Sequence, residues 1–227
     1  MYPNAPDGLW SARTELVRYG NRLLADGLSI GSAGNLSARV GDVVAITPSG
    51  IAYPLMRAAE ICLVTLKGAQ LADREAQPET PSSETPMHLA IYAATSAAAV
   101  VHTHSPEVIA LSAARRELPA IHYAITALGG PVRVAPYARF GSAQLADAAV
   151  AALDGRSAVI LRNHGAVTYG ADLAQAYERA LLLEWLACTY RLGLAYGKPA
   201  VLSAAELDEV AAESRRRRYG TRTAPGS

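Results

Sequence analysis

Cysteine is scarce in this sequence, with Cys62 and Cys188 the only two among 227 residues. Both stand among apolar neighbours, so they do not resemble the disulfide framework that staples small secreted domains. We expect two buried, unreactive thiols, because free cysteine in apolar surroundings behaves as a small hydrophobic residue.

Excess charge of one sign and long apolar runs are also missing. The formal net charge is +1, which provides no overall field to attract nucleic acid or an anionic membrane. No uncharged apolar stretch reaches the ~18 residues of a membrane span, and Met1 to Asn4 carry no basic segment of a signal peptide. We therefore expect a cytoplasmic protein without nucleic-acid or membrane partners. The basic residues that do cluster, Arg215 to Arg218, are typical of a solvated helix end.

The composition is that of a globular domain, since 51% of the residues are hydrophobic and 18% are charged. A single core can grow to roughly 250 residues before it splits. We expect one domain over residues 1–227, with its core at about 9–219 and a flexible C-terminal tail. Helical and strand patterns are interspersed, and the tight turns between several strands require antiparallel pairs. The sequence thus predicts an α/β fold in which three α/β/α layers enclose a mixed sheet.

Hydrophobic periodicity and turn residues place the individual elements. Strands are predicted at 35–40, 42–47, 61–66, 69–71, 98–103, 132–135 and 158–161. Helices are predicted at 9–24, from about 83 through 92, at 106–115, 143–153 and 172–194, and from about 203. The segment 162–165 is expected to form a loop.

Histidine is rare too, yet two of the five histidines form the motif His102-Thr103-His104 at the end of a predicted strand. Alternate residues of a strand point to the same face, so these imidazoles lie roughly 6–7 Å apart along the backbone and can bind one ion. A third, His164, follows another strand. Three histidines with an open fourth position are typical of catalytic zinc. The pair alone is equally typical of polar residues that leave a strand, and Pro106 and Glu107 disfavour a hydrolase motif of the His-X-His-X-Asp-His kind.

A second polar cluster, Ser82-Ser83-Glu84, stands at a predicted helix start. Serine hydroxyls there are ordinary caps, but the free N–H groups of a helix start also bind anions such as phosphate. The short segments Gly34-Asn35 and Ser49-Gly50 are ordinary turns, or they offer backbone N–H groups to the same anion. The residues alone leave both interpretations open.

Seven segments, taken in order, resemble those of the class II aldolase/adducin family. The resemblance extends from about Leu9 to Tyr219, and the common order is far more specific than any one segment. The segments are SAGNLS (32–37), ITPSG (46–50), PSSE (81–84), VHTH (101–104), PAIHY (119–123), APY with FG (135–137 and 140–141) and NHG (163–165).

The resemblance implies a mostly antiparallel sheet and one divalent cation, Zn²⁺ with Mn²⁺ or Co²⁺ as alternatives, on His102, His104 and His164. It implies that Glu84 is the acid/base and a further metal ligand when no substrate is bound. Tyr123 would donate a proton across a subunit boundary of a homotetramer. Phosphate would be bound by Gly34, Asn35, Ser49, Gly50, Ser82 and Ser83, and Phe140 and Tyr219 would line the aldehyde side.

The implied activity is that of an aldolase, a lyase that cleaves a ketose 1-phosphate reversibly to dihydroxyacetone phosphate and an aldehyde. The resemblance is closest to the branch that acts on L-fuculose 1-phosphate, and 5-deoxyribulose 1-phosphate is the other substrate considered. Alternatives on the same fold are a methylthioribulose-1-phosphate dehydratase, a pentulose-phosphate 4-epimerase, a decarboxylase of phosphorylated keto acids and a non-enzymatic scaffold. The family's epimerases carry Asp at the position of Glu84, and the scaffold members can lose the metal ligands.

Two departures from the family pattern concern substrate identity more than chemistry. Asn163 stands where the fuculose-specific branch has a further histidine, and the stretch Thr85-Pro86-Met87 also differs. The remaining histidines, His88 and His122, are expected to be structural, with His122 placed to orient its neighbour Tyr123.

Overall fold

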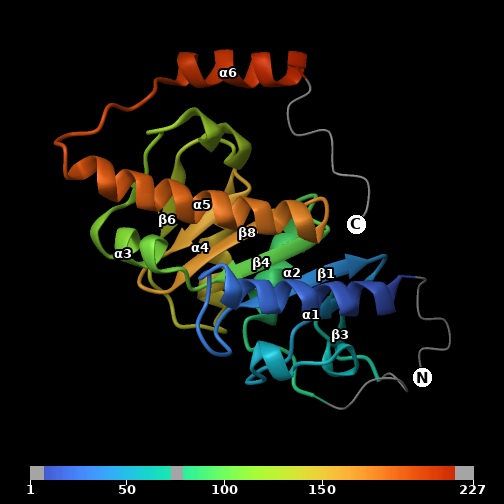
Figure 1. The fold of residues 1–227 in the computed structure, drawn as a ribbon. Coiled ribbons are helices and arrows are strands. Elements are labelled where there is room, and N and C mark those ends of the chain that lie inside the picture. Colours follow the sequence, from blue (N-terminus) through green and yellow to red (C-terminus); the bar gives the residue numbers. More distant parts are fainter. Residues whose placement is uncertain (1–7, 73–78, 218–227) are drawn as a thin grey trace.

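The computed structural model describes residues 8–72 and 79–217, and one eight-stranded sheet forms its centre (Figure 1). The strands are β1 (Asn35–Val40), β2 (Val43–Ile46), β3 (Cys62–Thr65), β4 (Ala99–Thr103), β5 (Glu117–Leu118), β6 (Val132–Ala135), β7 (Ala158–Leu161) and β8 (Gly165–Gly170). Their order across the sheet is β3-β2-β1-β4-β8-β7-β6-β5. All neighbouring pairs are antiparallel except the parallel pair β6 and β7. This confirms the predicted mixed, mostly antiparallel sheet.

Helices cover both faces of this sheet. The helices are α1 (Leu9–Ala25), α2 (Thr85–Ala94), α3 (Pro106–Ala114), α4 (Ala143–Leu153), α5 (Leu173–Leu194) and α6 (Ala204–Arg217), with short 3₁₀ turns η1 (Tyr53–Leu55), η2 (Ala58–Glu60) and η3 (Tyr123–Leu128). The apolar residues of α1, α3 and α5 pack on one face, and those of α2 and α4 pack on the other. The α/β/α layering is therefore as predicted.

Strand alternation divides the core between the two faces of the sheet. In β2, Val44 and Ile46 pack in the cluster of α2 and α4, whereas Val43 and Ala45 pack in the cluster of α1. In β4, Val100 belongs to the α2 and α4 cluster. His102, two residues further along the same strand, consequently points toward the layer that contains α2.

At several points the local elements differ from the sequence predictions. The segment 165–170 was not expected to be a strand, yet it forms β8 beside β4. The predicted strand 69–71 is reduced to a single bridge between Val64 and Gln70. The 3₁₀ turn η3 was not anticipated, and α2 begins at Thr85 rather than at Ser83, with Glu84 as its N-cap.

The C-terminal part of the described chain lies outside these layers. Helix α6 contacts η3, ends in the predicted arginine cluster, and pairs Arg216 with Glu213 at 2.6 Å (Figure 1). The predicted flexible tail beyond it, with Tyr219, lies outside the described residues. Both cysteines are free thiols, and Cys62 is buried as expected, whereas Cys188 is only half-buried on α5. Among the helices of residues 8–72 and 79–217, none combines the length and apolarity of a membrane-spanning segment.

Candidate metal centre

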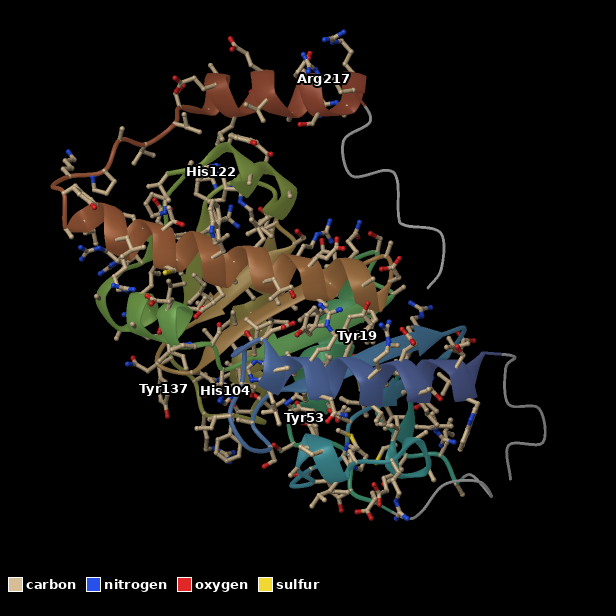
Figure 2. All side chains as sticks on the ribbon, in the orientation of Figure 1. Tyr19, Tyr53, His104, His122, Tyr137 and Arg217 are labelled. Atoms are coloured by element: carbon tan, nitrogen blue, oxygen red, sulfur yellow. The ribbon has the colours of Figure 1, made fainter. Side chains whose placement is uncertain are left out.

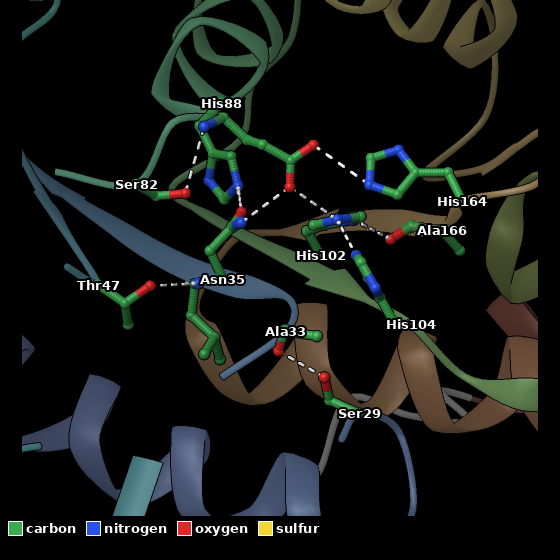
Figure 3. A network of polar contacts seen from close by, with 12 residues as sticks. Ser29, Ala33, Asn35, Thr47, Ser82, His88, His102, His104, His164 and Ala166 are labelled. Carbon is green, nitrogen blue, oxygen red and sulfur yellow. Dashed lines mark hydrogen bonds and ion pairs between the residues drawn. The ribbon is translucent and has the colours of Figure 1, made fainter. Parts of the chain in front are cut away.

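His102 occupies the middle of the sheet, because β4 lies between β1 and β8. Its side chain is fully buried. The Nδ1–H group donates a hydrogen bond to the carbonyl oxygen of Ala166 at 2.9 Å (Figure 3). This bond fixes the tautomer, so Nε2 carries the lone pair and faces α2, as second-sphere hydrogen bonds do for metal-binding histidines.

The other two predicted ligands approach His102 from neighbouring strand ends. His104 follows the last residue of β4, and His164 lies in the turn that joins β7 to β8. The three ring centroids are 4.8–4.9 Å apart, and the rings meet at interplanar angles of 70–83°. Segments far apart in the sequence therefore bring three imidazoles around one point (Figure 3).

Glu84 completes this group from the N-terminus of α2. Its Oε2 lies 2.9 Å from His102 Nε2, and its Oε1 lies 3.4 Å from His164 Nε2. One ligand atom from each of the four residues lies within 4.8 Å of the others. Glu84 Oε1 is buried without a hydrogen-bond partner in the described structure, which would be costly for an ionised oxygen. A divalent cation would satisfy it, and three imidazoles with one carboxylate suit zinc.

The electrostatics of the cluster keep the carboxylate ionised. Burial alone would raise the pKa of Glu84, but attraction to His102 and His164 and a hydrogen bond from Asn35 hold that pKa well below its usual range. Burial, assisted by repulsion from His102 and His164, lowers the pKa of His104 to about 3. The same effects of burial and His102 lower the pKa of His164 to about 4. Both rings are therefore neutral at pH 7 and have lone pairs to offer a metal ion.

Two glycines allow the strand ends to approach so closely. A Cβ atom at Gly165 would lie 2.0 Å from the carbonyl oxygen of Thr103, the residue between the two strand-end histidines. Gly34 has a φ of +75°, and a Cβ atom there would lie 2.6 Å from the carbonyl oxygen of His102. Side chains at these positions would push β8 and the 32–34 turn away from β4.

A cavity of about 290 Å³ opens in front of this centre. Glu84, His104 and His164 form its floor, while His102 lies behind them. All six residues predicted to bind phosphate also line it: Gly34, Asn35, Ser49, Gly50, Ser82 and Ser83. The aromatic side chains of Tyr137 and Phe140 stand at its exposed rim. The structure thus brings the predicted residues together, and their binding of phosphate stays a prediction.

Comparison with known proteins identifies the family. Residues 14–190 match the family model described as "Class II Aldolase and Adducin N-terminal domain". The chain belongs to this family.

Curated relatives and solved structures agree with this assignment. A 5-deoxy-D-ribulose 1-phosphate aldolase of Bacillus thuringiensis is 36% identical over 206 residues, covering 89% of this chain and 95% of the relative. An L-fuculose phosphate aldolase of Escherichia coli is 38% identical over 184 residues, covering 80% and 83%. A solved L-fuculose 1-phosphate aldolase has a TM-score of 0.85 and 35% identity, and the match covers 90% of this chain and 96% of that one. The predicted resemblance is confirmed.

Asn163, one of the departures from the family pattern, occupies a special backbone conformation. Its φ is +53°, the only positive value among the described residues other than glycine. Asparagine tolerates this left-handed region better than most residues. Its backbone N–H also donates to Ser112 Oγ at 2.9 Å, which ties the turn before His164 to α3. Asn163 therefore supports the third ligand through its backbone.

The predicted proton donor, Tyr123, does not lie at the cavity of its own chain. It is 56% exposed on η3 and is absent from the cavity lining. Its neighbour His122 stacks on it with ring centroids 4.4 Å apart and meets Trp185 edge-on at 5.0 Å. Figure 2 shows His122 well separated from His104. The expectation that His122 orients Tyr123 is consistent with this stacking, and the catalytic role of Tyr123 stays a prediction.

Sequence reasoning missed one part of the centre, a buried row of polar side chains beside Glu84. Asn35 was considered only as a phosphate ligand, and His88 only as a core histidine. In the structure Asn35 Nδ2 donates to Glu84 Oε2 at 3.0 Å, and His88 Nε2 lies 2.6 Å from Asn35 Oδ1 (Figure 3). The other ring nitrogen of His88 lies 2.7 Å from Ser37 Oγ. The available signal was the four-residue spacing of Glu84 and His88 on one predicted helix.

Proposed function

We propose that this protein is a metal-dependent aldolase that cleaves a ketose 1-phosphate to dihydroxyacetone phosphate and an aldehyde, and catalyses the reverse condensation. The observation that carries the proposal is the convergence of three imidazoles and Glu84 around one point, with Glu84, His104 and His164 lining one cavity. Family membership and the aldolase names of the relatives give the same reaction class.

A bound divalent cation would stabilise the negative charge that develops on the ketone oxygen when the carbon–carbon bond breaks. His102, His104 and His164 would hold it. Glu84 is ionised and has one buried oxygen, Oε1, without a hydrogen bond. In the condensation direction this carboxylate accepts a proton from dihydroxyacetone phosphate, and in cleavage it returns the proton.

The phosphate end is recognised without basic side chains. The cavity lining contains neither Lys nor Arg among the described residues. Hydroxyl groups of Ser49, Ser82 and Ser83, backbone N–H groups near Gly34 and Gly50, and the start of α2 are the donors present. Backbone amides and a helix N-terminus suit a phosphate dianion. With the phosphate bound by these donors, the ketone end of the same substrate would lie beside the metal-binding residues that line the same cavity.

Several finer features belong to this proposal. We assign zinc to the site, with manganese and cobalt as alternatives, because nitrogen-rich donor sets suit several of these ions. We assign a homotetramer in which Tyr123 of one subunit serves the cavity of another, since Tyr123 is exposed and remote from its own cavity. The cytoplasmic location also stays a prediction.

The substrate lies within a small group of ketose 1-phosphates. The relatives are named for L-fuculose phosphate and for 5-deoxyribulose 1-phosphate, and one from Rhodospirillum rubrum is named for 5-methylthioribulose 1-phosphate as well. These sugars differ at the aldehyde end, where Tyr137 and Phe140 form the rim. A retro-aldol screen of all three with the zinc-loaded protein, read as release of dihydroxyacetone phosphate, will identify the preferred one. Release from none of them contradicts the proposed function.

The role of Glu84 is tested by Glu84→Gln, which keeps the shape of the side chain and removes the base. We expect the zinc-loaded variant to lose at least ~100-fold in kcat/KM, because general acid–base catalysis typically contributes 10²–10⁴-fold. Metal content is measured in parallel, so that loss of zinc is not mistaken for loss of the base. Glu60→Gln is the matched control, since Glu60 pairs with Arg57 and does not line the cavity. Full turnover by metal-loaded Glu84→Gln would rule out this role.

A further inference from the structure

Two rows of polar side chains face each other between α2 and β1, next to the proposed base. On α2 the row is Glu84, His88 and Tyr92, spaced by four residues, and on β1 it is Asn35 and Ser37, spaced by two. Four helical residues rise about 6 Å, and two strand residues rise about 6.6 Å. The spacing between successive side chains is therefore nearly the same in both rows, so each residue of one row can contact residues of the other.

Hydrogen bonds join these residues into one chain that ends at the carboxylate. Asn35 Nδ2 lies 3.0 Å from Glu84 Oε2, and Asn35 Oδ1 lies 2.6 Å from His88 Nε2 (Figure 3). His88 Nδ1 is 2.7 Å from Ser37 Oγ, which is also 2.7 Å from the hydroxyl of Tyr92. His88 and Ser37 are fully buried, and Asn35 and Tyr92 are 6% and 2% exposed.

The ionised carboxylate fixes the direction of every bond in this chain. An ionised carboxylate only accepts, so Asn35 presents its N–H group to Glu84 and its carbonyl oxygen to His88. His88 must then donate through Nε2 and accept at Nδ1. Ser37 consequently donates to His88 and accepts from Tyr92. With the opposite amide orientation, the Asn35 oxygen would face the carboxylate oxygen and repel it.

We propose that His88, acting through Asn35, is a positioning residue for the Glu84 carboxylate, an inference that rests on the proposed function. The Asn35 amide holds Oε2, whereas Oε1 makes no hydrogen bond within the described residues, lies 3.4 Å from His164 Nε2, and is left to exchange the proton. The fixed Nε2–H tautomer of His88 prevents Asn35 from rotating its amide. His88 touches neither the cavity nor the reacting atoms.

Burial of this chain argues for a role beyond packing. Besides the hydrogen-bonded polar side chains, the layer that contains His88 is built of buried apolar residues, among them Met87, Ile91 and Val100. Replacing both partners of a buried hydrogen bond by apolar groups of the same shape is nearly neutral for stability. A fully satisfied polar network, by contrast, specifies a unique arrangement of its members. This arrangement of hydrogen-bonded side chains ends at Glu84, whose carboxylate must be held in one position to act as the base.

The first test compares His88→Leu with His88→Gln in zinc-loaded protein. Leucine removes the donor to Asn35, and glutamine restores one. We expect His88→Leu to lower kcat by about 10- to 100-fold, the usual effect of losing an outer-sphere partner. KM and zinc content should stay within about threefold, and His88→Gln should recover most of kcat. Tyr92→Phe, at the far end of the hydrogen-bonded row, should lower kcat less than His88→Leu does. Ile91→Val, an apolar change on the same helix, controls for packing.

Unchanged kcat in folded, zinc-loaded His88→Leu would overturn the inference, and so would an equal loss in His88→Gln. Melting temperatures of all variants separate these outcomes from unfolding. If the wild type cleaves no ketose phosphate, the proposed function fails, and the positioning of Glu84 is then tested by spectroscopy alone. Nitrogen-15 NMR of histidine-labelled protein reports the tautomer without any substrate. We expect His88 to carry its proton on Nε2. A proton on Nδ1, or a mixture of tautomers, would contradict the donor and acceptor directions assigned to the hydrogen bonds between Glu84 and Tyr92.

Discussion

His102 shows how the surroundings of a single residue leave one ring nitrogen able to bind a metal ion. Its Nδ1–H group donates to the backbone carbonyl of Ala166 in β8, so Nε2 is the nitrogen that points toward Glu84 and the other two histidines. His88 is arranged in a comparable way, with each ring nitrogen committed to one neighbour. In both cases the fold chooses the tautomer, which the sequence does not state.

Buried neutral histidines make the metal-free protein sensitive to acid. Burial lowers the pKa of His88 to about 3, whereas an unfolded histidine titrates near its ordinary value of about 6.5. Between these values the unfolded state binds the extra proton, so the free energy of unfolding falls as pH falls, by about 1.4 kcal/mol per pH unit for one such histidine. The pKa of His102 is raised by Glu84 against the effect of burial, so its proton stabilises the folded state below pH ~6.5, and that contribution is lost as pH rises above this value.

Urea unfolding of metal-free protein at steps from pH 7.5 to 4.5 measures this dependence. We expect the free energy of unfolding to decline as pH falls below about pH 6, where the unfolded state protonates the histidines that are buried and neutral in the fold. His88→Leu is the control, because it removes one buried histidine and should flatten the decline. A wild-type curve that stays level down to pH 4.5 would contradict the buried, neutral state of His88.

At the residue scale the sequence predicted which four residues come together at the candidate metal centre, and it missed the polar side chains that support Glu84. Histidines two apart on a strand share a face whatever the strand contacts, so His102 and His104 could be paired from the sequence. The contact between Asn35 and Glu84 depends on how α2 lies across β1, and only tertiary packing decides that. The location of Tyr123 relative to a cavity is likewise decided by assembly.

Among the elements, α3 depends on a side chain from another helix. Its own N-cap, Ser105, makes no side-chain capping bond. Instead Glu184 of α5 accepts from the backbone N–H groups of Glu107 at 2.9 Å and Val108 at 3.0 Å. A carboxylate at a helix start satisfies free N–H groups and complements the helix dipole. Because α3 begins at Pro106, two residues after His104, this cap lies close in the chain to the candidate metal centre.

We expect Glu184→Ala to lower the free energy of unfolding by about 1–2 kcal/mol, the usual cost of losing a helix cap. Glu184→Gln keeps one acceptor oxygen and loses the charge, so its free energy of unfolding should fall less than that of the alanine variant. Chemical denaturation of both variants beside the wild type measures the difference. Equal stability of all three proteins would show that the cap does not contribute.

Element positions were predictable where local pattern and tertiary role agree. β6, β7 and α4 begin and end at the predicted residues, because apolar strands and a serine-capped helix are locally distinct. β8 was missed because glycine stands at both its ends, and glycine disfavours strands. Gly165 is required there by the close approach of Thr103, a contact that no local pattern reveals.

For the whole molecule, the arrangement of Tyr123 raises the question of assembly. Tyr123 and Trp185 are exposed aromatic residues that share a surface with His122, remote from the cavity of the same chain. Cyclic oligomers place the same patch of every subunit against a neighbour. If Tyr123 donates its proton to a substrate, it does so in the cavity of a neighbouring subunit, and each active site then combines residues of two chains.

Mixing two inactive variants in one oligomer tests whether Tyr123 serves the cavity of a neighbouring subunit. Tyr123→Phe and Glu84→Gln should each be nearly inactive alone, since one lacks the donor and the other the base. Co-expressed with different affinity tags and purified through both, they form mixed oligomers in which some sites join an intact Glu84 to an intact Tyr123 of the neighbour. With random assembly about one quarter of the sites are complete, so we expect about one quarter of wild-type activity. If Tyr123 served its own chain's cavity, no mixed site would be complete and activity would stay at the level of the single variants.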